Sequence, residues 1–107
     1  MANFMKLMKQ AASMQKDIER VQKEMAEKTV EFSSGGGMVK ATARGDGTIV
    51  AIRIDPQIVD PSDVEVLEDA VKAAVDGALT EAREMTAREM GKVTSSLGLP
   101  GGVRGLA

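Results

Sequence analysis

The 107-residue chain contains no cysteine, histidine, tyrosine or tryptophan. Without cysteine, disulfides and thiolate metal sites are excluded. The usual proton shuttles, the thiol nucleophile and the commonest metal ligand are missing together with these residues. The sequence therefore predicts a protein that is not an enzyme, with no catalytic residue, no metal site and no bound cofactor.

Long apolar runs are also missing. No stretch approaches the ~20 consecutive apolar residues that span a bilayer. At the N-terminus, Lys6, Lys9 and Gln10 interrupt the segment in which a signal peptide would have its apolar core. We therefore expect a cytoplasmic protein with no membrane partner and no small-molecule substrate.

Two features that resemble ligand sites have simpler explanations. Four aspartates could be imagined as a hard-cation site, namely Asp46, Asp55, Asp60 and Asp63. They lack the spacing of a calcium-binding loop, and each stands where aspartate is favoured in a turn or a helix cap. The triple glycine at 35–37 is not followed by the Lys-Ser/Thr of a phosphate-binding loop, so it predicts a mobile hairpin loop.

The size and the charge distribution both point to a partner. A single domain of this length has a thin core, and Phe4 and Phe32 are the only aromatic residues available to fill it. We expect a second copy of the chain to supply the missing burial. The net charge is −2, but residues 1–54 carry nine Lys/Arg against six Asp/Glu, whereas residues 55–107 carry five against ten. The N-terminal half can therefore present a positive face.

Residues 3–28 are predicted to form a helix, with Asn3 as its N-cap. Apolar residues recur there at alternating spacings of three and four, at Phe4, Leu7, Ala11, Met14, Ile18, Val21 and Met25. This stripe is expected to be buried, and packing against the protein's own sheet or a partner helix is favoured over a free-standing coiled coil. The basic residues that fall off the stripe are expected to stay solvated, and they are Lys6, Lys9, Lys16, Arg20 and Lys23.

Three short segments have the alternating pattern of strands. Residues 29–33 predict a first strand with Val30 and Phe32 on one face. Residues 39–44 and 49–54 flank Gly45-Asp46-Gly47, a strong hairpin signal in which residues 46 and 47 would form a type I′ turn. That turn predicts apolar pairs on one face of the hairpin, namely Ala43–Val50, Ala41–Ile52 and Val39–Ile54.

The second helix is predicted from Pro61 to about Thr94, with Asp60 as its N-cap. Its inner stripe comprises Val64, Leu67, Val71, Ala74, Ala78, Ala82 and Met85. Beyond Met85 the apolar pattern thins, so the last turns are not expected to be fully buried. At ~1.5 Å per residue the helix is longer than the sheet and must project in part. Residues 1–94 are expected to form the domain, and the glycine-rich residues 95–107 a flexible tail.

Several stretches, in order along nearly the whole chain, carry a family resemblance. The most specific is the strand end Ile52-Arg53-Ile54-Asp55-Pro56, followed by Val59-Asp60-Pro61 and then Leu67-Glu68-Asp69 in the long helix. The others are residues 5–11 leading to Met14-Gln15, then Ala73-Ala74 and residues 97–101. Together they resemble the YbaB/EbfC family of nucleoid-associated DNA-binding proteins.

The resemblance implies an α+β fold, with an α-β-β-β-α protomer that contains a three-stranded antiparallel sheet and two long helices. It further implies a homodimer formed through the sheet region, from which the helices project as arms. Double-stranded DNA is the expected partner, in a cytoplasmic protein associated with the bacterial nucleoid and linked to gene regulation. The residues expected to contact phosphates are Lys6, Lys9, Lys16, Arg20, Lys23, Arg83, Arg88 and Lys92. The acidic residues interleaved among them weaken this expectation, and they are Glu81, Glu84 and Glu89.

Two alternatives stay open. In the first, the outer face of the sheet, carrying Lys40, Arg44 and Arg53, meets DNA and the helices only dimerise. In the second, the Met-rich first helix grips partner proteins as a scaffold and DNA affinity is incidental. On composition alone, a basic run of this kind is a solvated face in most proteins. No cluster of side chains forms a base-reading code, so a DNA sequence preference is left open.

Overall fold

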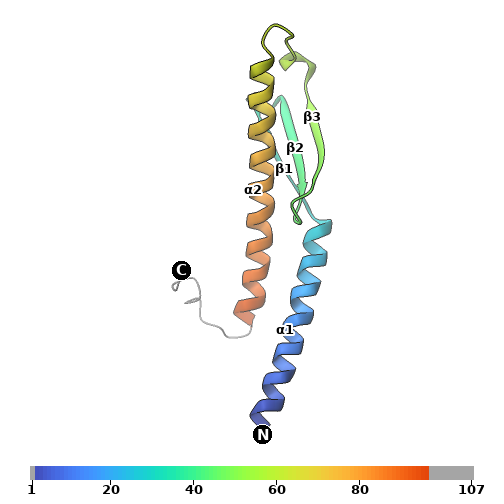
Figure 1. Ribbon diagram of the computed structural model, residues 1–107, viewed down its shortest axis with the longest axis vertical. Coiled ribbons are helices and arrows are strands. Elements are labelled where there is room, and N and C mark those ends of the chain that lie inside the picture. Colours follow the sequence, from blue (N-terminus) through green and yellow to red (C-terminus); the bar gives the residue numbers. More distant parts are fainter. Residues whose placement is uncertain (1, 97–107) are drawn as a thin grey trace.

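The computed structural model describes residues 2–96 and contains two long helices and three strands (Figure 1). In chain order, the elements are α1 (Ala2–Glu27), β1 (Thr29–Ser34), β2 (Val39–Arg44), β3 (Ile49–Ile54) and α2 (Val64–Ser96). Short 3₁₀ turns lie at Gly35–Gly37 and Pro56–Ile58. The predicted α-β-β-β-α order and α+β class are confirmed.

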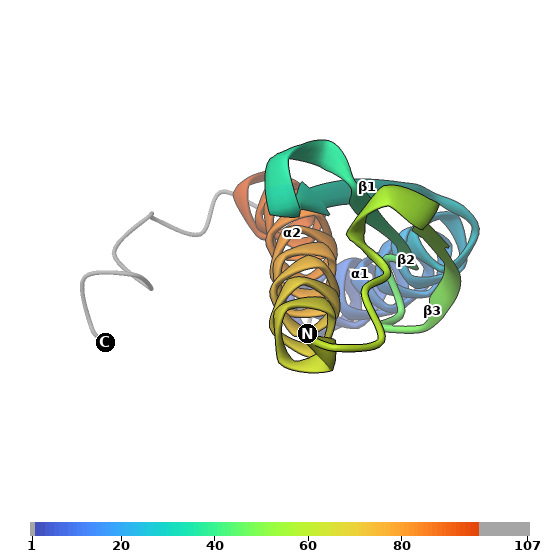
Figure 2. The ribbon, with the colours of Figure 1, turned by 90° about the horizontal axis from the view of Figure 1, so that it is seen from above.

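The protein is a thin rod rather than a sphere. Its principal extents are 73 × 27 × 15 Å, and its radius of gyration is 19.8 Å, against about 13 Å for a compact chain of this length. The antiparallel sheet has the order β1-β2-β3. Helix α2 lies along one face of this sheet and continues past its end, where it runs beside α1 (Figures 1 and 2). Among residues 2–96, no helix lies on the other face of the sheet.

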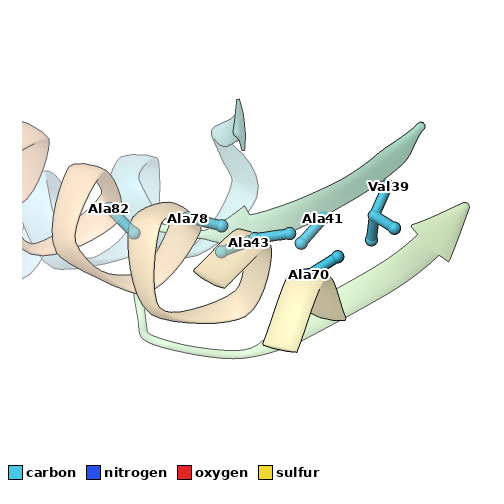
Figure 3. Packing of buried hydrophobic residues seen from close by; sticks show 7 residues of the cluster. Val39, Ala41, Ala43, Ala70, Ala78 and Ala82 are labelled. Carbon is cyan, nitrogen blue, oxygen red and sulfur yellow. The ribbon is translucent and has the colours of Figure 1, made fainter. Parts of the chain in front are cut away.

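The main core lies between α2 and the central strand. Val39, Ala41 and Ala43 of β2 are fully buried against a row of small residues on α2, namely Ala70, Ala74, Ala78 and Ala82 (Figure 3). Alanines at a spacing of four leave little side chain between the helix and the strand, so the two backbones approach closely. Most of the predicted inner stripe of α2 is confirmed, but Val64 is 51% exposed because it is the first residue of the helix.

A second apolar cluster joins α1 and α2 beyond the end of the sheet, where the two helices run side by side. Val21 and Met25 of α1 are buried against Val93 of α2, and Met14, Ile18, Met85 and Met90 pack around them. The last turns of α2 are not fully buried, as expected, because Arg88, Lys92 and Ser95 are exposed, but α1 buries Val93. The segment that extends beyond its neighbour is instead the N-terminal half of α1 (Figure 1).

The β2–β3 hairpin keeps the predicted pairing away from its turn. Val39 pairs with Ile54 and Ala41 with Ile52. Nearer the turn, a β-bulge places Ala43 opposite Ile49 instead of the predicted Val50. Ile49 consequently packs against the core, while Val50 is 42% exposed.

The predicted type I′ turn is wrong. That turn requires a positive φ at both Asp46 and Gly47, but of these two residues only Gly47 has one, at 88°. The loop has three residues rather than two: the Gly47 amide donates to the Arg44 carbonyl, and the Arg44 amide donates to the Thr48 carbonyl. A left-handed glycine at the third loop position is typical of such hairpins, and the bulge absorbs the extra residue. In the connection between β1 and β2, the Met38 amide donates to the Gly35 carbonyl in a 3₁₀ turn.

The helix boundaries differ slightly from the predicted ones. Asn3 lies inside α1 and is not its N-cap. Asp60 does not cap α2, because its carboxylate accepts from the Ser62 amide and hydroxyl in a separate turn, and the helix begins at Val64. Helix α2 spans Val64–Ser96, so residues 95 and 96 of the predicted tail are helical. Residues 97–107 lie outside the described residues.

Candidate nucleic-acid interface

A row of lysines runs along the solvent side of α1. Lys6, Lys9, Lys16 and Lys23 are exposed, whereas Val21 and Met25 on the opposite side of the same helix are buried. At about 100° per residue, Lys9, Lys16 and Lys23 lie within one narrow stripe. Within residues 2–96, none of these four ammonium groups has a carboxylate within 4.0 Å. We call these four residues the lysine stripe.

Two further predicted contact residues are neutralised locally. Arg20 lies 3.8 Å from Asp17 and 3.2 Å from Glu24, and Lys92 lies 3.0 Å from Glu89. The hydrogen bond from Lys92 lowers the pKa of Glu89, so this carboxylate stays charged beside its partner at neutral pH. In each of these ion pairs the two residues are three or four positions apart on one helix, and this spacing in the sequence predicts such pairs.

The structure brings Arg20 and Lys92 together although they come from different helices. Both line a cavity of about 240 Å³ between α1 and α2, together with Asp17, Val21, Glu89 and Val93. The cavity holds cations and carboxylates in equal number. It is therefore suited to joining the helices and offers no net positive charge to a polyanion.

The two arginines of α2 stand apart from the lysine stripe. Arg83 and Arg88 are exposed, but they are five residues apart and so project about 140° from one another. The Nε of Arg83 donates to the Leu79 carbonyl at 3.3 Å, while Arg88 has no ion pair within the described part of the chain. Of the eight predicted contact residues, the structure thus places four on the lysine stripe, brings Arg20 and Lys92 together at the cavity between the helices, and leaves Arg83 and Arg88 apart from both groups.

The outer sheet face is less available than the helix. Lys40 lies 3.8 Å from Glu31 of the neighbouring strand. Arg44 is only half exposed, and its Nε is buried without a hydrogen-bond partner. Arg53 is exposed on β3. This face therefore presents one fully exposed cation where the lysine stripe presents four.

Strand β3 forms an open, apolar edge of the sheet. Ile52 and Ile54 are 43% and 41% exposed although they share the face of β2 that is buried under α2. Beside them, an apolar groove of about 500 Å³ runs between β3 and α2, lined by Ile54, Leu67, Glu68, Val71, Lys72, Val75 and Asp76. Helix α2 covers β1 and β2 and leaves this strip uncovered.

A second uncovered apolar surface lies at the start of α1 and was not predicted from the sequence. The stripe of α1 was expected to be buried along its whole length, yet Phe4 is 63% and Leu7 62% exposed, as are Met5 (61%) and Met8 (56%). The cause is the length of α2, which ends before it reaches these residues (Figure 1). Comparing the two predicted helix lengths with the strands between them would have revealed the overhang.

Within residues 2–96, no cluster of three or more His, Cys, Asp or Glu side chains could hold a metal ion. In the same part of the chain, neither helix has an apolar stretch long enough to cross a bilayer. Three of the four aspartates considered above, Asp46, Asp55 and Asp60, each accept a hydrogen bond from the backbone amide two residues later. The amide of the fourth, Asp63, donates to the Asp60 carbonyl.

A small α+β chain that displays a cationic helix and an open apolar sheet edge belongs structurally with proteins that bind a polyanion. The comparison with protein families makes this specific. The chain belongs to the YbaB/EbfC DNA-binding family, whose profile matches residues 1–97. This is a family of DNA-binding proteins and not of enzymes.

Relatives with recorded names agree with this assignment. The chain is 52% identical over 99 residues to the nucleoid-associated protein Teth39_2199 of Thermoanaerobacter pseudethanolicus, covering 92% of this chain and 89% of that protein. It is also 52% identical over 101 residues to a nucleoid-associated protein of Moorella thermoacetica, covering 94% and 97%. The crystal structure of the uncharacterized protein HP0035 from Helicobacter pylori has the same fold, with a TM-score of 0.62, 22% identity and coverage of 73% of this chain and 90% of that one.

Proposed function

We propose that the protein binds duplex DNA as a homodimer through the basic side chains of its helices, and that it acts in the cytoplasm on nucleoid organisation and gene expression. The observation that carries the proposal is the lysine stripe, four exposed ammonium groups without a carboxylate partner among residues 2–96. Lysines of this kind replace condensed counterions along the phosphates, which gives affinity without base recognition. Family membership supports DNA as the polyanion.

The proposed second subunit rests on the open sheet edge. An edge strand with free backbone groups and exposed isoleucines is a template for pairing with another chain. The apolar groove beside Ile54 continues this surface onto α2. A second copy seated there would bury both features and would carry a second lysine stripe, which doubles the number of phosphate contacts.

Fluorescence-anisotropy binding of duplex DNA across a salt series tests the proposal. With about eight phosphate contacts per dimer, affinity should fall about 10⁴-fold between 50 and 200 mM salt. Replacing Lys6, Lys9 and Lys16 with Gln should weaken binding and flatten the salt dependence. The control is Lys28→Gln, which removes an exposed lysine that lies outside both the lysine stripe and the apolar groove. Unchanged binding by the triple variant would refute the role of α1.

Two further variants sharpen the test. Glu89→Gln releases Lys92 from its 3.0 Å ion pair and should raise DNA affinity. Replacing Lys40, Arg44 and Arg53 with Ala removes the cations of the outer sheet face. If this triple variant abolishes binding while the lysine-stripe variant does not, DNA meets the sheet and not the helix.

A further inference from the structure

The first turns of α1 form an amphipathic helix that no other described element covers. Residues 3–13 are all exposed, including the large apolar side chains of Phe4, Met5, Leu7 and Met8. This segment extends past the end of α2 (Figure 1). Four neighbouring apolar side chains that are each more than half exposed form an interaction surface rather than scattered surface residues.

The two sides of this segment differ in chemistry. At about 100° per residue, the apolar side chains occupy an arc roughly 160° wide, and they are Phe4, Met5, Leu7, Met8, Ala11 and Ala12. The rest of the circumference carries Lys6, Lys9, Gln10, Ser13 and Lys16. Residues 2–16 contain three lysines and no aspartate or glutamate. The segment therefore has a wide apolar face and a purely cationic polar face.

Charge and polarity discriminate among the occupants of this surface. Duplex DNA complements the lysines but offers no apolar phase to Phe4 and Leu7. A second copy of the segment, or residues 97–107 of this chain with Arg104, would complement the apolar arc but supply no carboxylate to the lysines. The surface of an anionic bilayer matches both faces at once, because acyl chains lie directly beneath phosphate headgroups.

We propose that the N-terminal turns of α1 bind the surface of anionic membranes, with Phe4, Met5, Leu7 and Met8 in the acyl region and Lys6, Lys9 and Lys16 among the headgroups. The expectation of no membrane partner rested on the lack of a spanning segment, whereas surface binding requires only an amphipathic helix. The inference goes beyond DNA binding and does not depend on it. Because both ligands use the same lysines, DNA and vesicles should compete.

Vesicle co-sedimentation of the full chain, without DNA, tests this inference. Each lysine near an anionic leaflet gains about fivefold in binding, so vesicles that contain phosphatidylglycerol should bind about 100-fold more tightly than pure phosphatidylcholine. Phe4→Ser with Leu7→Ser should lose at least about tenfold in vesicle binding while DNA affinity stays unchanged. The control pair, Val59→Ser with Val66→Ser, removes two apolar side chains, each 50% exposed, outside this segment and should bind vesicles normally.

A spectroscopic variant measures insertion directly. The chain contains no tryptophan, so Phe4→Trp places a single reporter at an exposed position. Its emission should shift to the blue with anionic vesicles and not with phosphatidylcholine.

Several results would overturn the proposal: no blue shift, equal binding to both lipids, or unchanged binding by the Phe4/Leu7 variant. A smaller oligomer for the Phe4/Leu7 variant in lipid-free solution would assign the surface to a second copy instead. Blue emission without lipid that is lost when residues 97–107 are removed would assign it to the C-terminal segment.

Discussion

At the scale of single residues, Gly77 of α2 leaves room for the ring of Phe32. A Cβ built on this residue would overlap the ring of Phe32 on β1. Gly77→Ala gains about 1 kcal/mol of helix propensity, but displacing the ring should outweigh this gain and destabilise the protein by about 1–3 kcal/mol net. Urea unfolding measures the difference.

Gly91 of the same helix provides the control. A Cβ there meets nothing within 4 Å, so Gly91→Ala should stabilise the protein by about 0.5–1 kcal/mol. Equal stabilities for the two variants would mean that the Phe32 ring does not pack over Gly77.

The turn before α2 predicts a pH effect at one carboxyl group. Hydrogen bonds from the Ser62 hydroxyl and amide lower the pKa of Asp60 below its usual 3.8. A lowered folded-state pKa contributes stability above the unfolded pKa, and that contribution is lost as the pH falls through the folded value. An NMR titration should therefore place the Asp60 midpoint below 3.8. In Ser62→Ala the midpoint should move up toward that value, and a midpoint that does not move would exclude the hydroxyl as the main cause.

At the scale of elements, the contact between α1 and α2 depends on a few buried side chains. Met25 is 1% exposed and Val21 2% exposed where they meet Val93. Met25→Ala should cost about 2–5 kcal/mol in unfolding free energy, from lost transfer energy and the cavity that remains. Met8→Ala removes the same side chain at a position that is 56% exposed and should change stability by less than about 0.5 kcal/mol. A similar small effect at both positions would show that the two helices are not held together by this cluster.

The strands could be predicted from the sequence because apolar and polar residues alternate along them. Only one orientation of each strand buries its apolar face. Val39, Ala41 and Ala43 can face α2 only if their polar neighbours face outward, and the pairs of Val39 with Ile54 and Ala41 with Ile52 keep apolar side chains on that same face. The turn could not be predicted as reliably, since Asp-Gly suits both a two-residue loop and the observed three-residue loop. In the observed loop, the Gly45 amide donates to the Met25 and Lys28 carbonyls at 2.9 and 3.0 Å, a tertiary contact that local turn propensity does not contain.

The candidate site was predictable in its chemistry, and the spacing of residues on the helices also indicates its ion pairs, but the coverage of α1 was predicted wrongly. The spacing of the lysines placed them on the solvent side of α1, because the apolar stripe fixed the buried side. Burial of Phe4 and Leu7 was predicted wrongly, since it depends on where another element ends. The periodicity of apolar residues within α1 does not indicate how far α2 extends along it. It therefore could not show that α2, which ends at Ser96, stops short of Phe4 and Leu7.

At the scale of the whole molecule, the rod shape keeps the lysine stripe away from the acidic part of the chain. The stripe lies on α1, whereas residues 55–107 carry ten of the sixteen acidic residues. The early part of α2, which carries several of them, lies beside the sheet at the other end of the 73 Å rod (Figure 1). At about 8 Å, the Debye length at physiological salt is much shorter than this rod. A chain with net charge −2 can therefore present a locally positive surface to DNA.

Disrupting the sheet edge should halve the salt dependence of DNA binding without removing the lysines. Ile52→Glu with Ile54→Glu places two charges on the exposed edge of β3 and should yield a monomer in analytical ultracentrifugation. With four lysines instead of eight, the slope of log affinity against log salt should change from about −7 to about −4. Ala73→Glu with Thr80→Glu adds the same charge at exposed positions of α2 outside the groove and should leave both mass and slope unchanged. A monomeric edge variant that retains the steeper slope would mean that one subunit makes all the phosphate contacts, and a wild-type monomer in dilute solution would refute the dimer itself.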